Sequence, residues 1–267
     1  MSDDTTRCGS LHAVQPWLIP AAVLTLWLAA CESGAIPAYL LPHPVQIGGA
    51  AYSYLFGSPG AMPYAGRFWE DVASSIVRVG LGFGLAVAVG IPTGFFSGRR
   101  ALVNRLISNT INALRAVPGI SWLPLAMVWF GIGINTTVFL VALAAFFPIY
   151  LNTASGVRQV NPIYFQAGAM LGISPVRGVF AILLPAAMPQ IIAGLRLGLG
   201  IAWAYLVLGE LTGVPNGLGA VIMDARMLGR IDMIVVGIIL IAVLGRVSDL
   251  LLHQFMRLCF KSARRLS

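Results

Sequence analysis

Charged residues are scarce in this chain. Only 10% of its 267 residues are Asp, Glu, Lys or Arg, whereas 58% are hydrophobic. A soluble domain has about a quarter charged residues, and its core cannot bury so large an apolar surplus. The composition therefore predicts an all-α polytopic membrane protein with one membrane domain. A β-barrel is not expected, because its segments of about ten residues would alternate in polarity.

Motifs for common chemistry are also missing from the sequence. It contains no G-x-x-x-x-G-K-[ST] phosphate loop, no H-E-x-x-H zinc motif and no G-x-S-x-G nucleophile motif. The histidines are dispersed, and Cys8, Cys31 and Cys259 have neither metal-ligand nor disulfide-framework spacing. We expect no enzyme activity, no cofactor and no metal in this chain. A pair of intramembrane carboxylates is the one enzymatic alternative.

Six apolar stretches are present, and they predict six transmembrane helices, because a bilayer core of about 30 Å takes about 20 helical residues. Their approximate bounds are 15–31, 72–97, 107–131, 136–153, 186–208 and 231–256. They form one domain, 15–256, between an N-terminal tail, 1–14, and a basic tail, 257–267. A surface-lying helix is expected around Pro44–Phe56 in the first external connection.

The first stretch has a competing interpretation. Leu28–Cys31 resembles a lipoprotein cleavage box, but Asp3, Asp4 and a single Arg7 make a poor positive n-region. We expect this stretch to be retained as a span, and cleavage at Cys31 is the alternative.

Glycine and proline predict local features of the spans. The glycines at 80, 82, 84 and 90 lie in an apolar run without a preceding strand, so they predict close helix packing rather than a nucleotide loop. Pro118 and Pro124 predict breaks in the third stretch, because proline lacks a backbone donor.

Basic residues set the orientation. With both termini cytoplasmic, the inside segments hold Arg7, Arg99, Arg100, Arg105, Arg158, Arg177, Arg257, Lys261, Arg264 and Arg265. The outside segments hold only Arg67, Arg226 and Arg230. This excess predicts cytoplasmic termini and a cytoplasmic loop at 157–185. Because the basic residues occupy short loops and tails, the net charge of +8 does not indicate nucleic-acid binding.

The loop 157–185 carries a spaced pattern. It matches E-A-A-x3-G-x9-I-x-L-P at Gln166, Ala167, Gly168, Gly172, Ile182, Leu184 and Pro185. The loop thus resembles the signature of binding-protein-dependent ABC importer permeases. Gln166 replaces the acidic residue and Gly168 the second alanine, so no salt bridge is expected at that point.

The resemblance extends from Phe68 to Gln254. Its blocks at 129–133, 147–153 and 194–196 are most similar to aliphatic sulfonate permeases within the nitrate, taurine and sulfonate branch. It implies a type I importer permease bundle in the bacterial plasma (inner) membrane. The implied partners are a second copy of the chain, cytoplasmic ATPase subunits and a periplasmic or lipid-anchored solute-binding protein. The implied solute is a small anion, with an aliphatic sulfonate favoured; taurine, nitrate, bicarbonate and a pyrimidine precursor are alternatives.

The resemblance also implies a mechanical role for the loop. The signature would form a short coupling helix in a groove of the ATPase, where Ala167 and Gly168 allow close approach of two backbones. Gly172 would supply the turn, and Pro185 would begin the fifth span. Two alternatives to an ATP-driven importer are an ion-coupled secondary carrier, which would show inverted repeats, and a membrane scaffold.

Charges within the spans are candidates for the pathway. A charge at the bilayer centre costs about 2.5–3.5 kcal/mol on insertion scales, so it faces protein or water. Arg196, present once in each of two copies, would line a central path for an anion. The alternative is that Arg196 caps carbonyls or pairs with a carboxylate. Glu210 is a candidate for gating or docking, against an ordinary interfacial carboxylate.

Three further arginines are assigned to local roles. Arg78 and Arg115 lie nearer the ends of their stretches and are expected to snorkel. Arg246 is expected to pair with Asp249, three residues later on the same helix.

Overall fold

The structure is a computed structural model that describes residues 8–34, 36–37, 40–58, 60 and 64–259, and every regular element in these ranges is a helix. The chain divides into two compact units. The smaller contains residues 1–66 and 224–236, and the larger contains 67–223 and 237–267. The predicted tail residues Arg7, Lys261, Arg264 and Arg265 lie outside the described residues.

The smaller unit contains α1 (Cys8–Glu32) and α2 (Pro44–Phe56). Helix α2 forms where a helix was expected. His43 caps it, because its Nδ1 accepts a hydrogen bond from the Val45 amide at 3.3 Å. Pro44 follows at the first helical position, where its missing N–H leaves no bond unmade.

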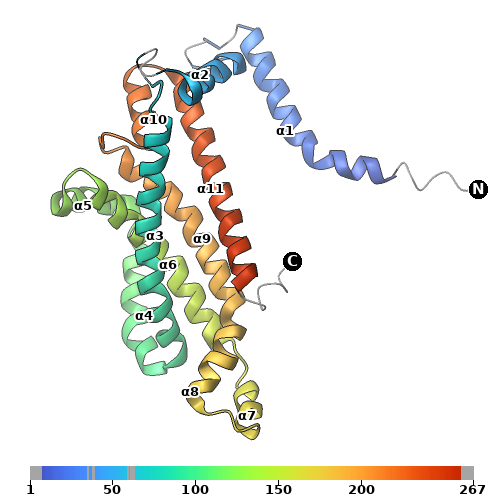
Figure 1. Ribbon diagram of the computed structural model, residues 1–267, viewed down its shortest axis with the longest axis vertical. Helices are drawn as coiled ribbons and strands as arrows, with labels where there is room; N and C mark the ends of the chain where they lie inside the picture. Colours follow the sequence, from blue (N-terminus) through green and yellow to red (C-terminus); the bar gives the residue numbers. More distant parts are fainter. Residues whose placement is uncertain (1–7, 35, 38–39, 59, 61–63, 260–267) are drawn as a thin grey trace, which may run out of the picture. The chain divides into compact units, whose positions relative to one another are not determined.

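The larger unit is built on α3 (Phe68–Arg99), α6 (Ile134–Arg158) and α9 (Leu184–Glu210), which run side by side in Figure 1. Their shared core includes Val141, Ile149 and Leu206, which are fully buried. A β-carbon on Gly82 would lie 2.6 Å from Val141, and one on Gly90 would lie 3.0 Å from Ile149. The predicted close helix packing is therefore confirmed at these two glycines; those at 80 and 84 face open space.

The third apolar stretch is sharply bent. Helix α4 (Ala101–Ala116) ends before Pro118, and Val117 is extended, as residues that precede proline usually are. A 3-10 turn (Gly119–Trp122) and α5 (Leu123–Phe130) follow at 90° to α4. The predicted break occurs at Pro118. Pro124 instead lies in the first turn of α5, which it starts rather than kinks.

Continuous helical backbone leads from α8 into the fifth span. Helices α7 (Ile163–Met170) and α8 (Pro175–Gly178) precede a π-helical turn (Val179–Leu183) that runs directly into α9. Pro185 lies in the first turn of α9 and has no N–H for the Ala181 carbonyl. The Leu184 amide donates to the Val179 carbonyl, five residues back, so the wider turn accommodates the proline.

Two helices complete the chain, α10 (Leu218–Met227) and α11 (Ile231–Cys259). In the described residues, four segments are long and apolar enough to cross a membrane: Phe68–Arg99, Ile134–Arg158, Pro175–Glu210 and Ile231–Leu258. The bent α4–α5 pair makes five if it counts as one span, and Leu18–Glu32 is a shorter apolar helix. The helical membrane class is confirmed, while six spans with cytoplasmic termini stay a prediction.

Candidate functional site

Four of the signature residues lie in a helical hairpin at the end of the bundle where α6 ends and α9 begins (Figure 1). This hairpin, residues 163–178, is hereafter the elbow. Its first arm, α7, carries Gln166, Ala167 and Gly168, and Gly172 lies in the turn between α7 and α8. The other signature residues, Ile182, Leu184 and Pro185, fall in the π turn and the start of α9.

A glycine closes the first arm of the elbow. The Gly172 amide donates to the Ala169 carbonyl at 3.0 Å, and the Ile173 amide donates to the Gly168 carbonyl at 2.9 Å. This bond pattern is a Schellman cap, which needs a left-handed residue, and Gly172 has φ of +76°. Ser174 then caps α8 by accepting from the Arg177 amide at 3.4 Å. The chain therefore changes direction within four residues.

Small residues allow α7 to pack closely on the π turn and on α8. Gly168 is buried, and a β-carbon there would lie 2.7 Å from Cδ1 of Ile182. The Phe165 ring would lie 3.6 Å from a β-carbon on Gly178. Phe165 also lies under the Arg99 guanidinium of α3, with 5.9 Å between guanidinium and ring centroid. The elbow is thus packed on the end of the bundle.

The outer surface of the elbow carries several large apolar side chains that nothing covers within one chain, beside the exposed Gln166 and Arg177. Met170 is 90% exposed, Leu171 81% and Val176 72%, and Phe180 in the adjoining π turn is 68% exposed. Gln166 and Ala167 are also exposed, whereas Gly168 faces inward. Exposed apolar patches on this scale are typical of surfaces that bind another protein.

A buried polar cluster joins the N-terminal part of α3 to the C-terminal end of α9. Arg78 donates to Glu210 with 2.6 Å between Nη1 and Oε1, and both side chains are buried. Glu210 also accepts from Ser75 Oγ at 2.8 Å and from the Gly219 amide at 2.8 Å. Arg78 further donates to the carbonyl and side-chain oxygens of Asn216. The expectation that Arg78 snorkels is therefore wrong, because Glu210 compensates its charge inside the protein.

Arg196 is engaged by a carboxylate. Its Nε and Nη2 donate to the two oxygens of Asp249 on α11, at 2.7 and 2.8 Å. Arg246 approaches the same carboxylate at 3.4 Å, as expected, but the bidentate partner is Arg196. In the structure Arg196 therefore pairs with a carboxylate, which was one of the alternatives to a role in the pathway.

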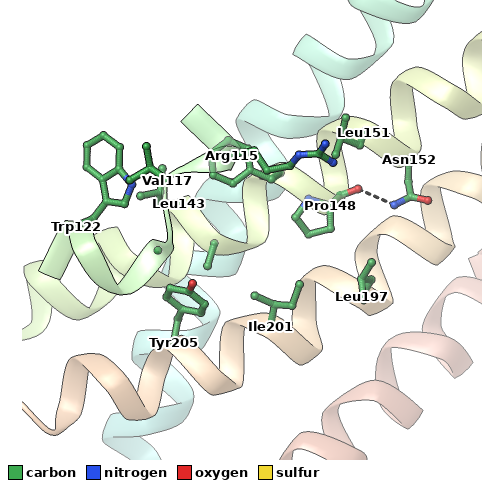
Figure 2. Close-up of a pocket in the computed structure, with 13 residues that line it drawn as sticks. Arg115, Val117, Trp122, Leu143, Pro148, Leu151, Asn152, Leu197, Ile201 and Tyr205 are labelled. Atoms are coloured by element: carbon green, nitrogen blue, oxygen red, sulfur yellow. Dashed lines mark hydrogen bonds between the residues drawn. The ribbon is translucent and has the colours of Figure 1, made fainter. Parts of the chain in front are cut away.

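A pocket lies between the α4–α5 bend and the helices α6 and α9 (Figure 2), with a volume of about 330 Å³. Arg115, Trp122, Phe147, Asn152 and Tyr205 are among its lining residues. Sequence reasoning missed this site. A usable signal was the polar stripe of α4, where Asn104, Ser108 and Arg115 recur at helical spacing.

Comparison with known proteins assigns the family. Residues 90–258 match the family described as binding-protein-dependent transport system inner membrane component. The chain belongs to this family.

Named relatives of this permease agree. The putative aliphatic sulfonates transport permease protein SsuC of Bacillus subtilis is 35% identical over 87% of this chain and 81% of its own length. The taurine transport system permease protein TauC of Escherichia coli is 32% identical over 89% of this chain and 85% of its own length. The predicted family and branch are therefore confirmed, and the permease is an inner-membrane protein.

The fold of this permease also has a solved counterpart. The structure of the MetNI methionine ABC transporter in inward-facing conformations superposes with a TM-score of 0.61 over 71% of this chain and 94% of that chain. The two sequences are only 19% identical, so this likeness supports the type I importer fold alone.

Proposed function

We propose that this permease pairs with a second copy and two cytoplasmic ATPase subunits to import a small organic anion, an aliphatic sulfonate. A separate solute-binding protein delivers the anion from outside. Each copy crosses the inner membrane six times, with 15–256 as the membrane domain and both termini in the cytoplasm. ATP is hydrolysed by the partner subunits, because the chain has no phosphate-binding loop. The similarity to SsuC and TauC supports a sulfonate as solute.

The elbow is the observation that carries this proposal. Its exposed apolar residues, including Met170 and Leu171, lie in a loop that the positive-inside rule assigns to the cytoplasm. Lipid cannot cover them there, so a soluble partner with an apolar groove fits. The signature residues Gln166, Ala167, Gly168, Gly172, Ile182, Leu184 and Pro185 build this contact and its attachment to α9. Closure of the ATPase dimer then moves the elbow, and with it the bundle, between inward-open and outward-open states.

The elbow can be tested by one charge substitution. Leu171→Asp places a carboxylate in the proposed contact, and we expect loss of ATPase copurification and of ATP-driven uptake. Leu102→Asp is the matched control: Leu102 is 69% exposed at the start of α4, outside the elbow. Normal assembly of the Leu171→Asp variant would contradict the coupling role.

The solute and the energy source need a separate experiment. The complete importer, in vesicles, is offered radiolabelled ethanesulfonate, taurine, nitrate and bicarbonate, with ATP inside. We expect ethanesulfonate to be taken up; selective uptake of taurine would favour the second candidate, which the similarity to TauC supports. Uptake by the permease alone, driven by an ion gradient, would instead show a secondary carrier.

A further inference from the structure

The pocket beside the α4–α5 bend has two chemically different ends (Figure 2). In this view the Arg115 side chain extends toward Leu151, on the side where Asn152 lies, and Trp122 lies on the other side. Tyr205 lies below the bend, near the aromatic side. The end of the pocket near Asn152 thus offers a cation and an amide, and the end near Trp122 offers aromatic and aliphatic groups.

Backbone details of α6 add polarity to the first end. Pro148 has no N–H, so the carbonyl of Ala144, another lining residue, receives no helical hydrogen bond from it. Asn152 donates from its side chain to the Pro148 carbonyl at 2.8 Å, which fixes the orientation of the amide. These features occur at a proline inside a membrane helix, where freed carbonyls are tolerated beside protein or water.

Arg115 is available for a ligand. Among the residues that the structure describes, no carboxylate pairs with Arg115, whereas Arg78 and Arg196 each have one. Arg115 also continues a polar stripe of α4 that includes Ser108 and Asn112. Polar side chains in a spanning segment face protein or water rather than lipid, so we expect this face of α4 to border protein or water.

The aromatic end is shaped by a close contact. A β-carbon on Gly119 would overlap the Tyr205 ring, so the 3-10 turn packs directly on α9 at this point. Ile201, on the turn of α9 before Tyr205, lines the pocket between its two ends. An occupant of this space meets a guanidinium at its charged end and rings or aliphatic groups along its length.

We propose that this pocket is a transit site for an anion with a short apolar tail, with the anionic group held by Arg115. The proposal deepens the proposed function, on which it rests, since it places the sulfonate class at a site in the permease itself. Guanidinium groups suit the oxygens of such anions, because their donors form a fixed fork. The apolar lining favours an alkylsulfonate over a fully hydrated inorganic ion.

Cysteine labelling tests the pocket without transport. The full chain, with Cys8→Ser, Cys31→Ser and Cys259→Ser, carries Ile201→Cys in native membrane vesicles. Two reagents of similar size are compared: the anionic sulfonatoethyl methanethiosulfonate, itself a short alkylsulfonate, and the cationic trimethylammonioethyl methanethiosulfonate. We expect the anionic reagent to react faster, and added ethanesulfonate to slow it.

The Arg115 substitutions decide the electrostatic part. Arg115→Gln should lower the ratio of anionic to cationic labelling about tenfold, the size expected for a unit charge at short range in a partly screened site. Arg115→Lys should change this labelling ratio much less, because lysine keeps the positive charge. An unchanged ratio in Arg115→Gln, or no labelling by either reagent, would overturn the proposal.

The pocket shape has its own matched pair. Gly119→Ala should slow both reagents, because its β-carbon displaces Tyr205, whereas Gly200→Ala on α9 faces open space and should not. Charge-selective labelling in a protein that fails to import ethanesulfonate would keep the site and reject the proposed solute. Normal import of ethanesulfonate with no effect of Arg115→Gln on labelling would keep the proposed solute and reject the site.

Discussion

The guanidinium of Arg78 and the carboxylate of Glu210 meet at 2.6 Å although 132 positions separate them in the chain. The pair joins the first turns of α3 to the last turn of α9. It also holds the connection to α10, because the Gly219 amide donates to Glu210 and Asn216 accepts from Arg78. One charge pair therefore fixes three segments at this end of the larger unit.

Removal of one partner of this pair should be costly. Glu210→Gln leaves Arg78 buried without a countercharge, and breaking such a pair costs about 3–5 kcal/mol. We expect a clear fall in the unfolding midpoint of the detergent-solubilised permease, followed by tryptophan fluorescence. Arg246→Gln is the control, because Arg246 is 67% exposed and 3.4 Å from its carboxylate, and exposed pairs contribute at most about 1 kcal/mol.

The double variant Arg78→Met/Glu210→Met separates charge from hydrogen bonding. Both charges are gone, so stability should recover in part, because apolar replacements of buried pairs are often tolerated. Recovery should be incomplete, because the Gly219 amide and the Ser75 hydroxyl lose their acceptor. A double variant as unstable as Glu210→Gln would mean that the ion pair is not the dominant interaction.

A charge exchange tests whether Arg196 is structural. Arg196→Asp alone places two carboxylates together with Asp249, and we expect poor assembly and uptake. The exchange Arg196→Asp/Asp249→Arg restores opposite charges across α9 and α11, so assembly and uptake should largely return. If assembly returned but uptake did not, position 196 itself would need a cation, as a pathway residue does.

Local signals explain what the sequence predicted well. The apolar runs, the α2 helix and the break at Pro118 follow from composition, capping and proline geometry, which act within a few residues. The turn at Gly172 likewise follows from a glycine between two short helices. The signature spacing likewise predicts the position of the elbow, because the motif is local in the sequence.

Long-range pairing explains what the sequence did not predict. Arg78 pairs with Glu210, and Arg196 with Asp249, only because the fold brings α3 to α9 and the Asp249 side chain of α11 to α9. Hydropathy cannot distinguish a snorkelling arginine from one paired inside a bundle. The pocket lies beside the 90° bend after α4, and the proline in the sequence predicts a break there but not its angle.

Gly172 should tolerate no β-carbon without strain. Its φ of +76° is left-handed, where a non-glycine residue costs roughly 1–2 kcal/mol. Gly172→Ala should therefore loosen the elbow, and Gly172→Asn should do so less, since Asn adopts this region more readily. Limited proteolysis within 163–178 measures the effect, and equal cleavage of both variants and the parent would contradict it.

Gly168 offers a graded test of how closely the elbow packs on the bundle. Its β-carbon would meet the flexible end of Ile182 at 2.7 Å, so Gly168→Ala requires only a small shift of that side chain. We expect assembly with the ATPase to survive, consistent with the alanine that the signature has at this position. The larger side chain of Gly168→Leu cannot be accommodated by a small shift of Ile182, so it should separate α7 from the π turn. We expect loss of uptake while membrane insertion is retained. Because Ala169 is exposed on the same helix, Ala169→Leu is the matched control, and equal damage by both leucines would locate the defect outside the Gly168–Ile182 contact.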